Sequence, residues 1–236
     1  MSELLVFVGT YTERTPGSSK GIYAARFDTT SGRLAGLTAV AELQNPSWIT
    51  LSRDRRFLYA VSEVGVADAS GTPAGLVVAY SVAADGKLTE LNRVSSGGAD
   101  PCHLAVDRAG RTVAVANYTG GSTVSFHVGS DGKLGAPTKD QHVGKGPNAE
   151  RQESAHAHSV DFVADDRLLL SCDLVLLHRT NLRHDRGIDV CVVTNSVSKP
   201  VACKTIEPHG FIPTMVAWTS AVRPAGLTVT IGGILR

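Results

Sequence analysis

Two histidines, His156 and His158, are the side chains in this chain best suited to acid–base chemistry. An unperturbed imidazole has a pKa near ~6.5, so much of it is neutral and can accept a proton at pH 7. The two residues would share a face of an extended segment, where a metal ion could bind them together with Asp161 or Asp173. No third ligand is spaced convincingly, so we expect no metal and no cofactor. A structural His-x-His pair is the remaining alternative.

These histidines belong to a set of polar residues that recurs at two kinds of place. One kind of place is the start of a short apolar segment, where the chain has Ser47-Trp48, Cys102-His103 and His156 to Ser159. The other kind lies directly after a β-rich segment, where it has Ser62-Glu63, Asn117-Tyr118 and Asp173. Matching positions differ in residue type, whereas structural turns tend to repeat one residue. We therefore expect a polar site where these segments meet, with ordinary loop polarity as the alternative.

The segments that carry this set are copies of one repeat. Arg56, Arg111 and Arg167 each open a β-rich run, and they are 55 and 56 residues apart. A second marker follows in step, as Ser31-Gly32-Arg33-Leu34, Asp85-Gly86-Lys87-Leu88 and Asp131-Gly132-Lys133-Leu134. A period of this length is typical of arrays of small sheets and not of helical hairpins.

One repeat predicts four short strands joined by tight turns. In the second unit these are Trp48 to Ser52, Phe57 to Ser62, Leu76 to Val82 and Leu88 to Val94, with Asp85-Gly86 as a hairpin signal before the last. Such a sheet cannot cover both its faces alone, so several must pack around an axis as a propeller. The fold class is therefore all-β, with four-stranded antiparallel blades, and the polar set should share one rim.

Composition and charge exclude several other classes. The chain has 236 residues, 42% hydrophobic and 19% charged, as expected of a soluble globular protein, and a net charge of +1 argues against nucleic acid as a partner. Its four cysteines follow no C-x-x-C spacing, and no apolar run approaches a membrane span, so we expect a reducing, cytoplasmic location and no membrane. G-x-S-x-G and P-loop spacings are both missing.

Several motifs together resemble one known family. They are Val8-Gly9-Thr10-Tyr11-Thr12, Gly21-Ile22-Tyr23, Asn45-Pro46-Ser47, Leu58 to Glu63, Pro101-Cys102-His103, Ala116 to Gly121, and Glu150 to Glu153 before His156-Ala157-His158. Their order from about Leu4 to Leu174 resembles the lactonase family of seven-bladed propellers. Members of that family hydrolyse 6-phosphogluconolactone in the pentose phosphate pathway, and relatives lactonise carboxymuconate.

The resemblance implies a rim histidine that acts on a lactone with acidic and basic neighbours. Lactone opening needs a base for water and donors for the oxyanion, which suits His158 or His156 as the base and Glu63 as a further catalytic group. The expected contacts to a small phosphorylated sugar lactone are Arg151, His103, Lys145 and Asn117. Each has a plainer alternative: a solvated loop for Arg151, a backbone hydrogen bond for Glu63, and loop shaping for Asn117.

The resemblance stops after Asp173, where the repeat loses its phase and basic residues outnumber acidic ones. We therefore divide the chain into a partial propeller at 1–173, about three and a half blades, and a divergent tail at 174–236 that need not be homologous. Pro213 to Trp218 is the candidate for a strand donated to the first blade. Three interpretations compete: an active lactonase, an inactive truncated product, and a non-catalytic interaction module. Open blade edges could also allow self-association.

Overall fold

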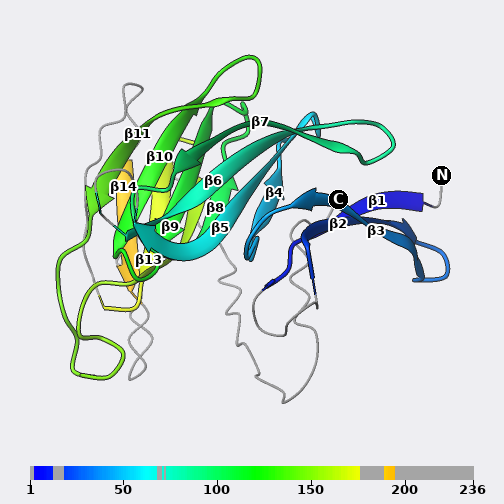
Figure 1. Ribbon diagram of the computed structural model, residues 1–236. Helices are drawn as coiled ribbons and strands as arrows, with labels where there is room; N and C mark the ends of the chain where they lie inside the picture. The colour runs from blue at the N-terminus through cyan, green and yellow to red at the C-terminus, as the bar shows by residue number, and fades with distance from the viewer. Residues whose placement is uncertain (1–2, 13–18, 68–70, 72, 176–188, 195–236) are drawn as a thin grey trace.

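The protein folds into strands arranged as four neighbouring sheets (Figure 1). The computed structural model describes residues 3–12, 19–67, 71, 73–175 and 189–194. The strands are β1 (Glu3–Val8), β2 (Gly21–Asp28), β3 (Leu34–Glu42), β4 (Ile49–Leu51), β5 (Phe57–Ala67), β6 (Pro73–Val82), β7 (Leu88–Ser95), β8 (Pro101–Val106), β9 (Thr112–Asn117), β10 (Ser122–Val128), β11 (Leu134–Gln141), β12 (Ala157–Val163), β13 (Leu168–Asp173) and β14 (Asp189–Thr194). The all-β prediction is confirmed.

Two of the sheets are complete four-stranded antiparallel blades. Their orders are β4-β5-β6-β7 and β8-β9-β10-β11, as the repeat predicts. The first sheet holds β1-β2-β3, and β1 corresponds to the second strand of the complete blades. The fourth sheet holds β12-β13-β14, and β14 pairs with β13 in parallel. The repeat geometry thus changes after β13, where the sequence loses its phase.

A turn that contains glycine precedes the last strand of each of the first three sheets. Gly32, Gly86 and Gly132 have φ values of 70°, 92° and 83°, a region that is strained for residues with a Cβ. In two of these turns the preceding aspartate fixes the loop, because Oδ1 of Asp85 accepts the N–H of Lys87 at 3.0 Å and Oδ1 of Asp131 accepts that of Lys133 at 3.2 Å. These turns lie on the rim opposite the polar set.

The hydrophobic core lies between neighbouring sheets. Tyr59 and Val77 of the second sheet pack with Val113 and Phe126 of the third, and all four side chains are fully buried. A similar cluster joins the first and second sheets, and a smaller one joins the third and fourth. The faces that one small sheet cannot cover are therefore buried by the next sheet, as the predicted stacking requires.

Bulges interrupt the innermost strands at the rim that carries the polar set. The register shifts between Pro101 and His103 on β8, and between Ala157 and Ser159 on β12. Cys102 and His158 are the extra residues at these two bulges. A bulge redirects a side chain without ending the strand, so both positions are set apart from the regular ladder.

Two predictions about the tail stay predictions. The proposed donated strand, Pro213 to Trp218, lies outside the described residues. The division of the chain at Asp173 likewise stays a prediction.

Candidate functional site

Tyr118 brings the two candidate histidines together at the rim. Its ring stacks on that of His156, with centroids 4.6 Å apart, and meets the ring of His158 edge-on at 5.3 Å. Tyr118 follows β9 in the third sheet, whereas the histidines lie at the start of β12 in the fourth. The site is therefore assembled from two blades, as the shared rim predicts.

The two histidines differ in their surroundings. His156 is buried, with Nδ1 3.1 Å from the carbonyl oxygen of Tyr118 and Nε2 3.1 Å from Oε1 of Glu153. Both nitrogens thus face oxygen acceptors, which suits a residue that fixes its segment better than one that takes a proton from water. His158, at the bulge, is exposed. Of the two, only His158 presents its side chain to solvent.

His103 lies beside this pair as a neutral imidazole. Its Nδ1 accepts a hydrogen bond from the backbone N–H of Val160 at 3.3 Å, and the centroid of its ring lies 4.1 Å from that of the Trp48 ring. Burial, and next the nearby His158, lower the pKa of His103 to about 4. His103 is therefore uncharged at neutral pH, with its remaining proton on Nε2.

Glu63 and Cys102 border the same rim from the second and third sheets. The hydroxyl of Tyr11 donates to Oε2 of Glu63 at 2.8 Å. Burial, followed by the charge of Glu63, raises the pKa of the Cys102 thiol, whose Sγ lies 3.5 Å from the carbonyl oxygen of His158. The buried thiol is thus a poor nucleophile, while Glu63 brings a carboxylate to the rim.

The other predicted residues lie apart from the histidines. Arg151 and Lys145 are exposed on the segment between β11 and β12, and within the described residues no hydrogen bond or ion pair joins either side chain to the rim histidines. Asn117 is fully buried, and its Nδ2 donates to the carbonyl oxygen of Ser96 at 3.0 Å and to Oγ of Ser122 at 3.1 Å. This position suits a structural clamp between blades better than a ligand contact.

A buried polar network behind the rim includes one residue that the sequence did not single out. Nδ1 of His142 lies 2.7 Å from Oδ2 of Asp173, and its Nε2 lies 3.2 Å from Oγ1 of Thr123, which in turn meets Ser171 at 2.7 Å. Oδ1 of Asp173 also accepts the backbone N–H of His156 at 3.0 Å. Asp173 thus links the third blade to the segment that carries the histidines.

The repeat held a signal for His142. Ser62 and Asn117 each donate to a backbone carbonyl just after the last strand of the preceding blade, at Gln44 and Ser96. His142 occupies the same place after β11, opposite Asp173. Aligning the ends of the outer strands, and not only the arginines, would have paired these residues.

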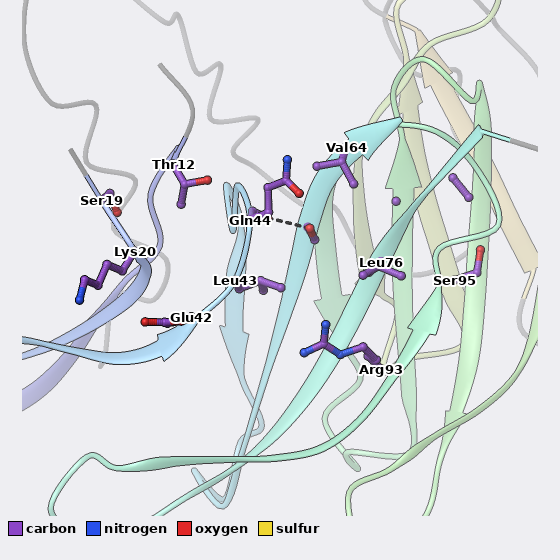
Figure 2. A pocket seen from close by; sticks show the side chains of 13 residues that line it. Thr12, Ser19, Lys20, Glu42, Leu43, Gln44, Val64, Leu76, Arg93 and Ser95 are labelled. Atoms are coloured by element: carbon purple, nitrogen blue, oxygen red, sulfur yellow. Dashed lines mark hydrogen bonds between the residues drawn. The ribbon is translucent and has the colours of Figure 1, made fainter. Parts of the chain in front are cut away.

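A separate hollow of about 530 Å³ lies between the first and second sheets (Figure 2). It is large enough for a small molecule, and polar residues such as Thr12, Lys20 and Glu42 line it together with Arg93. The guanidinium of Arg93 already binds Glu90 at 2.6 Å. Ser62 of the polar set lines this hollow, but none of the candidate catalytic or substrate-contacting residues does, so the hollow is distinct from the histidine rim.

Two kinds of feature are absent from the described residues. No group of three His, Cys, Asp or Glu side chains within them is arranged to hold a metal ion. No helix in the same part of the chain is long and apolar enough to cross a membrane.

Known proteins are similar to this chain over most of its described residues. Residues 5–176 match the family described as "Lactonase, 7-bladed beta-propeller". The chain belongs to this family. A 6-phosphogluconolactonase of Bacillus subtilis is 35% identical over 176 residues, which are 74% of this chain and 47% of that relative.

Solved structures of proteins named as lactonases superpose on a similar share of the chain. A candidate 6-phosphogluconolactonase from Bacteroides fragilis is 38% identical with a TM-score of 0.66, over 73% of this chain and 46% of that one. The periplasmic gluconolactonase of Pseudomonas aeruginosa is 33% identical with a TM-score of 0.63, over 73% and 48%. The chain thus spans about half the length of the relatives it matches.

Proposed function

We propose that this protein hydrolyses a lactone, with 6-phosphogluconolactone as the substrate and 6-phosphogluconate as the product. Relatives named 6-phosphogluconolactonase, together with the family match, support a lactonase activity. The observation that carries the proposal is the rim itself, where the exposed His158 lies beside the neutral His103. A step of the pentose phosphate pathway in the cytoplasm is the setting we propose.

In this proposal His158 is the general base. Water adds to the carbonyl carbon of the lactone and gives one proton to His158, and the carbonyl oxygen becomes an oxyanion. When the intermediate collapses, the bond to the ring oxygen breaks and that oxygen takes the proton back from His158. The product is a hydroxy acid, which ionises to its carboxylate. These proposed reaction steps use no metal and no cofactor.

The remaining residues have supporting roles. We propose that Glu63 polarises the water or a substrate hydroxyl from the second blade, and that Arg151 and Lys145, both exposed, bind the phosphate. His156 would position the segment, because its nitrogens already have partners. Asn117 is left out of the contacts with substrate because its side chain is buried in an interblade clamp.

The decisive experiment measures hydrolysis of 6-phosphogluconolactone by the purified chain against the spontaneous rate. Wild-type protein should exceed that rate, and His158→Ala should reduce kcat by about 10²-fold or more, the usual contribution of a general base. His127→Ala, an exposed histidine on β10, is the matched control and should leave the rate unchanged. Background hydrolysis by a folded wild-type protein would refute the proposal.

A non-catalytic interaction module is the second candidate. The chain covers only 41–47% of the relatives named 6-phosphogluconolactonase or probable 6-phosphogluconolactonase, so residues that those proteins use elsewhere have no counterpart in the matched segment. The same assay separates the two candidates, since a binding module would be folded and inactive.

A further inference from the structure

We infer that His103 is the hydrogen-bond donor to the carbonyl oxygen of the lactone, through an Nε2–H that the fourth blade holds in place. The inference rests on the proposed function and assigns distinct chemistry to two neighbouring imidazoles. His158 takes the proton from water, and His103 transfers none.

The geometry fixes which ring nitrogen of His103 carries the proton. The backbone N–H of Val160, on β12, points to Nδ1 of His103, on β8, at 3.3 Å. A nitrogen that accepts this bond must have a free lone pair, so the proton of the neutral ring is on Nε2. Since a backbone N–H cannot accept a hydrogen bond, the opposite tautomer would lose this contact.

Nε2 is free to reach a ligand from this position. The buried side-chain nitrogens and oxygens that lack a partner within the described residues are Ser47 Oγ, Trp48 Nε1, Tyr80 OH, Asn117 Oδ1 and Asp140 Oδ2. Nε2 of His103 is not among them, and no hydrogen bond to it from the described residues occupies it. His103 is half-buried as a residue, and its Nε2 therefore keeps some access to solvent.

The surroundings of His103 also keep it uncharged. Trp48, from the loop before β4, carries no charge, and its ring centroid lies 4.1 Å from that of His103. His158 is the titratable group from β12 that acts on the ring. A positive charge on His158, gained when it takes the proton from water, disfavours a second charge on His103. The donor therefore stays neutral at the moment when the oxyanion forms.

A neutral imidazole donor is well suited to an oxyanion. It stabilises the developing charge by a hydrogen bond that is already oriented. At neutral pH a neutral imidazole keeps its proton, so it donates the hydrogen bond without transferring the proton to the oxyanion. This arrangement also explains why the rim holds two adjacent histidines from different blades. Removing a single donor of this kind typically costs about 10²-fold to 10³-fold in kcat.

Two measurements on the full chain test the inference. Long-range ¹H–¹⁵N correlation of the imidazoles should show His103 with a protonated Nε2 and an unprotonated Nδ1, unchanged between about pH 5.5 and 8, as a pKa of about 4 requires. His103→Phe should lower kcat by about 10²-fold or more with little change in KM, and His103→Gln, which keeps an N–H donor, should recover part of the loss. His127→Gln is the control and should match wild type.

The outcomes separate this inference from the proposed function. Titration of His103 near neutral pH, a proton on Nδ1, or a His103→Phe rate within about twofold of an active wild type would overturn the inference alone. Background hydrolysis by the wild-type chain would overturn both.

Discussion

At the scale of single residues, the position of His158 depends on the ring of Tyr118. The ring meets His158 edge-on at 5.3 Å and stacks on His156 at 4.6 Å, so one side chain supports both imidazoles. His158 is exposed at a bulge, and within the described residues no hydrogen bond holds its imidazole. We therefore expect Tyr118 to act as a positioning residue, which holds His158 for the proposed reaction and does not itself act on the substrate.

Removing this ring should therefore lower kcat and leave KM nearly unchanged. Aromatic contacts contribute about 0.5–1.5 kcal/mol, so Tyr118→Ala should reduce kcat by roughly tenfold in the lactone assay. Tyr118→Phe keeps the ring and is the matched control, with activity near that of wild type. Equal rates for the alanine and phenylalanine variants would contradict the positioning role.

The residue types were predictable from the sequence, but their individual surroundings were not. His156, His158 and His103 stand at repeat positions where residue type varies, and this pattern marked them. Their different roles depend on a bulge in β12 and on the Val160 N–H, which local sequence does not reveal. The burial of Asn117 likewise follows from packing between blades.

At the scale of elements, Asp173 ties the third and fourth blades together. Burial alone would raise the pKa of Asp173, but hydrogen bonds from His142 and from the backbone N–H groups of His156 and Val175 outweigh it, and the pKa lies below its usual value. A carboxyl group whose pKa is lower in the folded protein stabilises the fold above its unfolded pKa of about 4. That contribution is lost as the pH falls further, through the folded pKa.

Asp173→Asn should therefore destabilise the protein at neutral pH by about 2 kcal/mol, or roughly 6 °C in Tm. The difference from wild type should shrink as the pH is lowered below about 4, where wild type loses the same charge. Thermal unfolding followed by circular dichroism at several pH values measures this. Asp161→Asn, on β12 of the same sheet, is the control: burial raises the pKa of Asp161, so its charge does not stabilise the fold and its loss should not lower Tm at neutral pH. A pH-independent loss in Asp173→Asn would contradict the charge argument.

Close backbone approach between blades leads to a second stability prediction. A Cβ on Gly75 of β6 would lie 2.2 Å from Cδ of Pro101 and 2.6 Å from the carbonyl oxygen of Ser62. Neither atom can move easily, so Gly75→Ala should cost about 1–3 kcal/mol, measured by denaturant unfolding. Gly65→Ala on β5 is the control, since its nearest neighbour would be Ala99 Cβ at 3.6 Å. Equal stability of the two variants would show that the blades separate without cost.

At the scale of the whole molecule, the repeat predicted the stacking of the sheets but not the fourth blade. Spacing, turn glycines and alternating apolar residues specify each antiparallel sheet locally, so the second and third blades match the prediction. The parallel pairing of β14 with β13 could not be read from the sequence, because nothing near Asp189 continues the repeat. The pairing partner of β1 on its other side is also not determined by local sequence.

The free side of β1 is an unprotected edge within the described residues. β1 pairs with β2 alone and without a register shift, whereas the outer strands β3, β7 and β11 all pair with bulges. β1 contains neither proline nor lysine, and its charged residue is Glu3 at one end. Bulges and charges are the usual protection against pairing between molecules, so among the described strands the β1 edge is the one best suited to accept a further strand.

We therefore expect the protein to associate through β1 as its concentration rises. Leu5 and Phe7 pack in the core between the first two sheets, so the alternating residue Val6 faces away from that core. Val6→Lys should shift the protein towards monomer in light scattering coupled to size-exclusion chromatography, with little change in Tm, because a lysine on an edge strand opposes pairing. Thr89→Lys adds the same charge to the outer strand β7, at an exposed position, and should leave association unchanged. A concentration-independent monomer in wild type, or equal association of both lysine variants, would show that the β1 edge does not pair between molecules.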